Sequence, residues 1–201
     1  MATPLFIRGL LWLWLLAAVY LGHTQGLAHL PAWALPLLCV ALAGAVIFLG
    51  DRIKLVREWF DGVELRALVL LSVTRFVGFY FLHLFARGEL PAQFAFVSGW
   101  SENLIAASAL VVAAAPFKPA LRRRVLAVWN VIGFVGLVLL TYNVTRLAMD
   151  DEAAAQLFSQ LPLNLLPQFL LPLLLVTHFL IHRRLERENQ SAAAGPESTD
   201  S

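Results

Sequence analysis

The sequence has few charged residues and only one cysteine. Asp, Glu, Lys and Arg make up 14% of its 201 residues, whereas a soluble domain contains about 25%. Hydrophobic residues make up 60%, which is more than one core of this size can hide from water. These proportions exclude an ordinary soluble enzyme, a disordered protein and a disulfide-stapled secreted domain.

Motifs for catalysis and cofactor binding are missing as well. The sequence contains no G-x-S-x-G, no H-E-x-x-H, no P-loop and no G-x-G-x-x-G pattern. A net charge of +2 provides no electrostatic footprint for nucleic acid. We therefore expect no enzymatic site, no cofactor and no nucleic-acid partner. The expected partner is the lipid bilayer, with a membrane protein or a second copy of the chain as further candidates.

Long apolar stretches predict the fold. A spanning helix needs about 20 mostly apolar residues, and six stretches qualify, at about residues 5–21, 30–49, 67–86, 93–115, 125–145 and 165–181. The sequence thus predicts an all-α, polytopic bundle of six transmembrane helices over residues 1–186, followed by a disordered cytoplasmic tail at 187–201. The first stretch lacks a small-x-small cleavage site, so we expect it to be retained. The small residues at 106–115 predict a central place for the fourth helix.

Basic residues predict the orientation of the bundle. Twelve of the 15 Lys and Arg residues lie in the N-terminus, in the loops 51–66 and 116–124, and in the tail. The opposite loops hold only Arg87 and Arg146, together with an acidic run at 150–152. Because basic loops stay in the cytoplasm, both termini are predicted to be cytoplasmic.

Three shorter features depart from simple spanning helices. Pro162, Pro167 and Pro172 each remove a backbone donor, which predicts a broken start to the sixth helix, packed against protein. Residues 153–161 are expected to form a short helix on the membrane surface. Residues 53–60 mix apolar and basic side chains, so they either lie along anionic headgroups or form a solvated linker.

Two charged residues are expected at the same depth in the bundle. Arg75 lies 11 residues before Ala86, where the third helix ends, and Glu102 lies 11 residues after Pro91, where the fourth begins. At about 1.5 Å per residue, both are roughly 16 Å from the outer boundary. An ion pair would offset much of the desolvation cost of each charge. The pair either fixes helix register only, or lines a polar cavity that binds or gates a substrate.

Other polar residues are predicted to join this pair in a buried polar site. Ser72, Arg75 and Phe79 share a helical face by spacing. Ser101 and Asn103 flank Glu102, and His83 lies near the outer end of the third helix. The candidate site therefore comprises Arg75, Glu102, Ser72, Ser101, Asn103 and His83.

The remaining histidines and the glycines of the fifth helix have simpler interpretations. His178 and His182 have a spacing that can bind a metal, but they directly precede Arg183 and Arg184. We therefore interpret them as interfacial anchors. Gly133 and Gly136 predict that the fifth helix has a close neighbour.

One segment resembles a known pattern. The residues Arg75-Phe-Val-Gly78, Gly88-Glu-Leu90-Pro91 and Gly99-Trp100 resemble those of small bacterial inner-membrane proteins that have an Arg-x-x-Gly helix and a Gly-x-Leu-Pro turn. In that pattern an acidic residue follows the Gly-Trp pair, where Glu102 stands here. The resemblance covers about 30 residues, implies a multi-pass protein of the bacterial inner membrane, and carries no known activity.

These observations favour a non-enzymatic membrane protein, either an accessory subunit or a small-solute permeation protein, built around Arg75 and Glu102. One alternative is a proton- or ion-coupled transporter in which Glu102 titrates. Another is an intramembrane lipid-modifying enzyme, with Ser101 as its conceivable nucleophile. A transporter should show discontinuous helices, whereas a lipid enzyme should show a nucleophile beside a base or a metal.

Overall fold

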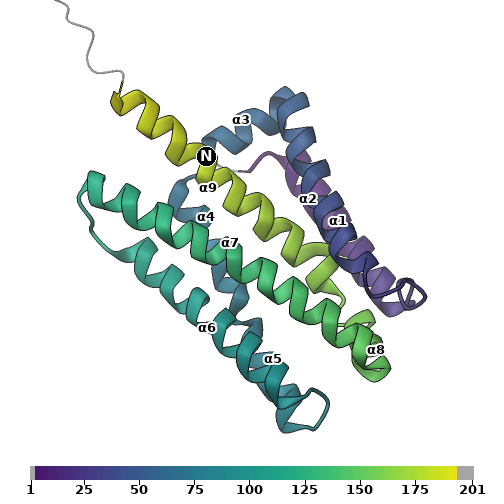
Figure 1. Cartoon of the computed structure of the whole chain (residues 1–201). Helices are drawn as coiled ribbons and strands as arrows, with labels where there is room; N and C mark the ends of the chain where they lie inside the picture. The colour runs from purple at the N-terminus through teal and green to yellow at the C-terminus, as the bar shows by residue number, and fades with distance from the viewer. Residues whose placement is uncertain (1–2, 194–201) are drawn as a thin grey trace, which may run out of the picture.

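The computed structural model describes residues 3–193, and this part of the chain is helical without any strand (Figure 1). Its α-helices are α1 (Leu5–His23), α2 (Ala34–Arg52), α3 (Lys54–Gly62), α4 (Leu65–Leu71), α5 (Val77–Ala86), α6 (Ala92–Ala114), α7 (Pro119–Asp150), α8 (Glu152–Ser159) and α9 (Leu171–Ala193). A 3₁₀ turn, η1 (Ser72–Phe76), joins α4 to α5, and a π-helical turn, η2 (Leu166–Leu170), leads into α9. The predicted all-α fold is confirmed.

Six helical segments are long and apolar enough to cross a membrane, as predicted. They are α1, α2, the continuous run α4–η1–α5, α6, α7, and η2 with α9. Several boundaries differ from the prediction. Helix α2 begins only at Ala34, after Pro31, and α7 extends from Pro119 to Asp150, well beyond both predicted ends.

The predicted tail is partly wrong. Helix α9 continues through Ala193, so residues 187–193 are helical instead of disordered. Residues 194–201, the rest of the predicted tail, lie outside the described residues.

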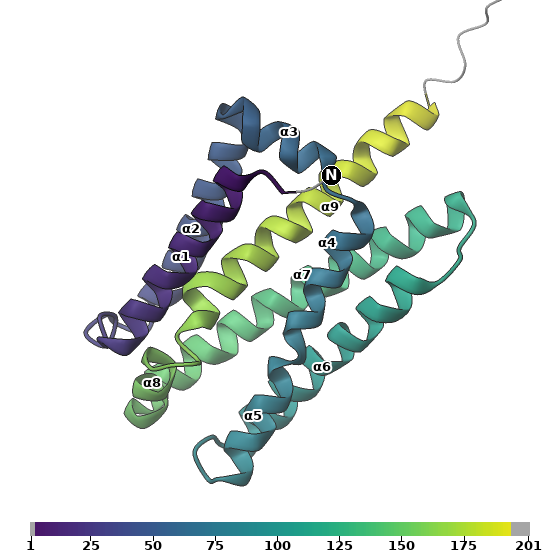
Figure 2. The same ribbon diagram turned by 180° about the vertical axis from the view of Figure 1, so that it is seen from behind.

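The connections gather at two opposite ends of the bundle (Figures 1 and 2). The α1–α2 loop, the α5–α6 loop and α8 lie at one end. Helix α3, the α6–α7 loop and the last turns of α9 lie at the other. We call the second end the basic end, because the loops 51–66 and 116–124 and the arginines at 183–187 belong to it.

Helix α9 occupies the centre of the bundle. It packs against α2, α4 and α7, and 61% of its most apolar window is buried, the largest share among the six segments. Helix α6, for which the small residues predicted a central place, has 44% buried and packs on α4, η1, α5 and α7. The small residues do permit close packing, since Ala106 and Ala109 are fully buried. The prediction failed because small residues indicate a close neighbour without indicating how many neighbours surround the helix.

The apolar core consists of two clusters. One lies toward the α5–α6 loop and includes Phe81, Phe94 and Phe158. The other lies toward the basic end and includes Phe60 and Trp129. Buried polar side chains from η1, α6, α7 and α9 lie between the two clusters.

The short helix predicted at residues 153–161 is present as α8, and residues 53–60, for which no helix was predicted, lie mostly in α3. Helix α3 packs through Val56 and Phe60, and the Phe60 ring occupies the space that a Cβ at Gly50 would need. Helix α8 begins at an N-cap, where Asp151 Oδ1 accepts hydrogen bonds from the amides of Ala153 and Ala154. The cap satisfies amides that the first turn leaves without helical partners.

The broken start of α9 is also confirmed. Pro172 has no N–H, so the carbonyl of Gln168, four residues earlier, lacks its helical donor. The indole Nε1 of Trp14 in α1 donates to this carbonyl at 2.8 Å. Asn164 Nδ2 donates to Ala18 O at 2.8 Å and makes a second contact with α1. The carbonyl that Pro172 leaves without a helical donor is therefore satisfied by Trp14. The two hydrogen bonds also hold α1 against the start of α9.

The α5–α6 hairpin depends on two facing glycines. A Cβ at Gly78 would lie 2.3 Å from Gly99 O, and a Cβ at Gly99 would lie 2.9 Å from Gly78 O. The two backbones therefore meet without intervening side chains, as small residues permit in packed helices.

Alanine at Gly78 should destabilise the protein, because the new Cβ would meet the backbone of α6. We expect a loss of about 1–3 kcal/mol, the range for overpacked cores, measured as thermal stability in detergent. Gly44→Ala is the matched control, since nothing lies within 4 Å of that position in α2. Equal stability of the two variants would contradict the close contact.

Candidate functional site

The centre of the bundle holds a fully buried ion pair. Arg75 is 0% exposed and Glu102 is 1% exposed. Arg75 Nε donates to Glu102 Oε2 at 2.7 Å, and Nη2 donates to Oε1 at 2.5 Å. A third donor, Nη1, reaches Gly133 O on α7 at 2.8 Å. The predicted pairing is therefore present in the bidentate geometry that is strongest for Arg and a carboxylate.

The pair and the glycine contact share one register. Arg75 faces Glu102, and Gly78 faces Gly99. Gly78 lies three residues after Arg75, and Gly99 lies three residues before Glu102. This opposite order is what two antiparallel helices require. The depth argument from the sequence relied on the same register, which explains why it predicted the pair.

The 3₁₀ turn η1 brings Ser72 onto the same side as Arg75. A 3₁₀ helix has three residues per turn, so residues three apart eclipse, and both side chains are 0% exposed. Phe79 does not share this face, since it is 53% exposed. The predicted common face was wrong at Phe79 because the spacing assumed one regular α-helix, whereas the winding changes at Val77.

Two glycines of α7 make room for the site. A Cβ at Gly136 would lie 2.8 Å from Arg75 Nη2, and a Cβ at Gly133 would lie 2.5 Å from His178 Cε1. The predicted close neighbours of α7 are therefore the side chains of Arg75 and His178, together with Ile105, whose Cδ1 would lie 2.7 Å from a Cβ at Gly136. Gly133 contacts both residues, since its carbonyl also accepts from Arg75.

His178 is a core residue and not an interfacial anchor. It is 1% exposed, and its Nδ1 lies 2.8 Å from Asn130 Oδ1. Asn130 Nδ2 in turn donates to His178 O at 3.1 Å, so Oδ1 is the acceptor and Nδ1 carries the proton. His182 is exposed and lies 3.2 Å from Glu186.

Sequence reasoning missed His178 because it ended the sixth helix at about residue 181. The helix continues to Ala193, which places His178 well inside it. A helical stripe was available as a signal: Leu174, His178, Ile181 and Leu185 recur at helical spacing, and all four are buried.

Other buried polar groups extend the site. Within residues 3–193, Ser72 Oγ, both amide atoms of Asn103 and His178 Nε2 have no hydrogen-bond partner. Toward the α5–α6 loop, Asn143 Nδ2 donates to Ser98 Oγ at 3.3 Å. Polar side chains thus follow one another through the bundle from the Ser98 contact to His178.

Two predicted members lie outside the site. Ser101 is exposed, and its Oγ donates to Ser98 O of its own helix at 3.1 Å. His83 is exposed and stacks on Tyr80, with ring centroids 6.2 Å apart. The structure therefore brings together Arg75, Glu102, Ser72 and Asn103, adds Asn130, Gly133 and His178, and leaves out Ser101 and His83.

A protein-family model described as a domain of unknown function (DUF8737) matches residues 32–186. The chain belongs to this family. The matched range contains every residue of the site and leaves out α1. No curated protein and no solved structure matches the chain.

The arrangement suits polar binding in a dry core. The Arg75 and Glu102 charges neutralise each other. Ser72, one 3₁₀ turn before Arg75, and the Asn103 amide, which lies against Gly78, have unused donors and acceptors. Among residues 3–193, no group of three His, Cys, Asp or Glu side chains could hold a metal ion. Ser101 contacts its own helix instead of a base. The unpartnered atoms of Ser72, Asn103 and His178 are free to form hydrogen bonds.

Removing either partner of the ion pair should strand a buried charge. For Arg75→Met or Glu102→Gln we expect losses of roughly 3–5 kcal/mol. The double variant should lose less than the sum, because neither charge is then isolated. Thermal unfolding in detergent measures all three variants, and additive losses would contradict the contact.

The exposed pair Arg146–Asp150 provides the control. Its atoms are 3.7 Å apart and both side chains are 68% exposed. Arg146→Met and Asp150→Asn should each change stability by at most about 1 kcal/mol, as surface ion pairs do.

Proposed function

We propose that this protein is a non-enzymatic, multi-pass protein of the bacterial inner membrane that passes small polar solutes through the polar core around Arg75 and Glu102. The observation that carries the proposal is the set of buried, unpartnered polar atoms on Ser72 and Asn103, in the same helices as the buried ion pair. Buried polar atoms without partners cost about 1–3 kcal/mol each. A passing solute or water can supply the missing hydrogen bonds.

The outward faces of the helices support a membrane location. Large apolar side chains are exposed along them, for example Leu13, Leu104 and Val111, which are 65%, 70% and 65% exposed. Lipid tails are the solvent that such faces prefer, whereas polar groups belong in the interior of a membrane bundle. An accessory subunit would share these faces, so transport itself is the discriminating measurement.

The basic end supports the orientation. The loops 51–66 and 116–124 and the C-terminal end of α9 lie together there, and basic loops are retained in the cytoplasm. Both termini are therefore assigned to the cytoplasm in this proposal.

Reporter fusions test the orientation directly. Fusions after Phe60, Lys118 and Ser191 should report cytoplasm, and fusions after Thr24, Glu89 and Glu152 should report the outer side. An outer signal at Lys118 would overturn the assignment, because that loop carries four basic residues within seven positions.

Solute flux tests the permeation function. The purified protein in liposomes should accelerate the shrinking or swelling driven by gradients of small neutral solutes, measured by stopped-flow light scattering. Asn103→Leu removes the unpartnered amide and should abolish the acceleration. Ser101→Ala, two residues away on the exposed face, should leave it unchanged. Folded wild-type protein that accelerates no solute in the panel would overturn permeation and favour an accessory role.

A proton-coupled transporter is the second candidate, favoured by one specific observation. Two titratable groups are buried near Gly133: His178 lies against it, and Glu102 is linked to it through Arg75. Ionisable groups in such positions often carry protons. Vesicles containing a pH-sensitive dye would then acidify only when solute is present. Glu102→Gln should remove the proton flux while Ser101→Ala keeps it.

A further inference from the structure

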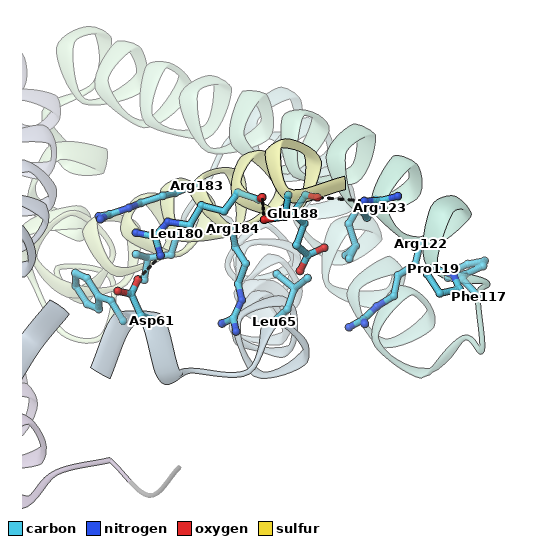
Figure 3. A pocket seen from close by; sticks show the side chains of 14 residues that line it. Asp61, Leu65, Phe117, Pro119, Arg122, Arg123, Leu180, Arg183, Arg184 and Glu188 are labelled. Atoms are coloured by element: carbon cyan, nitrogen blue, oxygen red, sulfur yellow. Dashed lines mark hydrogen bonds and ion pairs between the residues drawn. The ribbon is translucent and has the colours of Figure 1, made fainter. Parts of the chain in front are cut away.

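A cavity of about 680 Å³ opens at the basic end (Figure 3). Helices α3, α4, α7 and α9 line it. Five arginines line it, against two acidic residues: Arg122, Arg123, Arg183, Arg184 and Arg187, with Asp61 and Glu188. The remaining lining is largely apolar and includes Phe60, Leu126 and Leu180.

Three of the five arginines have no carboxylate partner among residues 3–193. Arg187 pairs with Asp61 at 2.6 Å, and Arg183 pairs with Asp51 at 2.9 Å. In the described part of the chain, Arg184 donates to the carbonyl of Val63, and Arg123 donates to the carbonyl of Glu188.

Arg122 is the third of these arginines. Across residues 3–193, no acidic side chain lies within ion-pair distance of Arg122, Arg123 or Arg184. Arg122 and Arg184 extend toward the same side of the cavity in Figure 3. An unpaired arginine cluster over apolar side chains suits an anion that carries its own apolar part.

A second hollow continues from this cavity. It measures about 190 Å³ and shares Leu65, Phe117, Arg122 and Leu126 with the first. From there it is lined by Arg66 and Val69 of α4 and by Val112 and Ala113 of α6. The basic cavity therefore leads into a crevice between two spanning segments, where Arg66 and Arg122 lie beside apolar side chains of α4 and α6.

We propose that this composite cavity is a binding site for an anionic phospholipid. The lipid phosphate lies among Arg122, Arg123 and Arg184, and an acyl chain enters the crevice beside Ala113. A free phosphate would use the arginines but would leave the crevice unexplained, so the crevice favours the lipid. The proposal rests on the membrane location proposed above, and it is independent of what the core conducts.

Native mass spectrometry of the full-length protein in neutral detergent tests the site, because the mass identifies what is bound. With equal amounts of phosphatidylglycerol and phosphatidylcholine, we expect the anionic lipid to be retained preferentially. Each arginine near a phosphate contributes about fivefold in affinity. Arg122→Gln with Arg184→Gln should therefore weaken phosphatidylglycerol binding by about 25-fold. Glu188→Gln, which removes a negative charge from the cavity, should strengthen it.

The matched control removes two positive charges at the same end but outside the cavity. Arg124 is exposed on α7 next to Arg123, and Arg57 is exposed on α3; neither lines the cavity. Arg57→Gln with Arg124→Gln should keep the preference for phosphatidylglycerol. Equal loss in both double variants would mean that general surface charge attracts the lipid, and would overturn the site.

A second arm separates lipid from free anion. Ala113→Leu fills the crevice and should weaken phosphatidylglycerol binding, while inorganic phosphate should give no stable adduct. Two results together would show a phosphate site and overturn the lipid assignment. The protein would form phosphate adducts that the Arg122/Arg184 variant loses, and Ala113→Leu would leave lipid binding unaffected. Failure of either arm leaves the reporter-fusion and flux results standing, so the two proposals can fail separately.

Discussion

The structure depends on burying Arg75 and Glu102 together. Either charge alone in a dry interior would cost several kcal/mol, and only a well-formed pair offsets that cost. The bidentate geometry fixes how α6 lies against η1 and α5, and the third arginine donor, to Gly133, fixes α7 against both. Sliding any of these helices by one turn would strand a charge, so the pair specifies register as well as contact.

The same constraint organises the rest of the core. Helix α7 must leave room for the guanidinium of Arg75 and the imidazole of His178. Glycines at 133 and 136 provide this room, because they have no side chain there. Apolar clusters then close the bundle above and below this polar layer. Because the layer keeps unpartnered atoms at Ser72 and Asn103, it is less stable than an apolar core would be, and that cost is our reason for placing function there.

Helix α9 links the polar layer with the basic end. His178 lies in the core and Arg184 in the basic cavity, six residues or about 9 Å apart along one helix. Two hydrogen bonds hold the proline-broken start of this helix against α1. Trp14 of α1 donates to Gln168 O, and Asn164 donates to Ala18 O of α1. One continuous helix thus meets three environments: the apolar cluster near the α5–α6 loop, the polar layer, and the charged surface at the basic end.

The sequence by itself determined the helical fold, the six apolar segments, the break before α9 and the Arg75–Glu102 pair. Each of these follows from local composition or from counting residues along one hairpin, where the register is set by a short turn. Only the tertiary structure decided that α9 is central, that His178 is buried against Asn130, and that Ser101 and His83 point outward. Those outcomes depend on which helices meet. A stripe such as Leu174, His178, Ile181 and Leu185 marks a buried face of one helix, but it does not identify the helix that packs on that face. Register along a hairpin is local information, whereas the packing of separate helices is a collective property of the whole bundle.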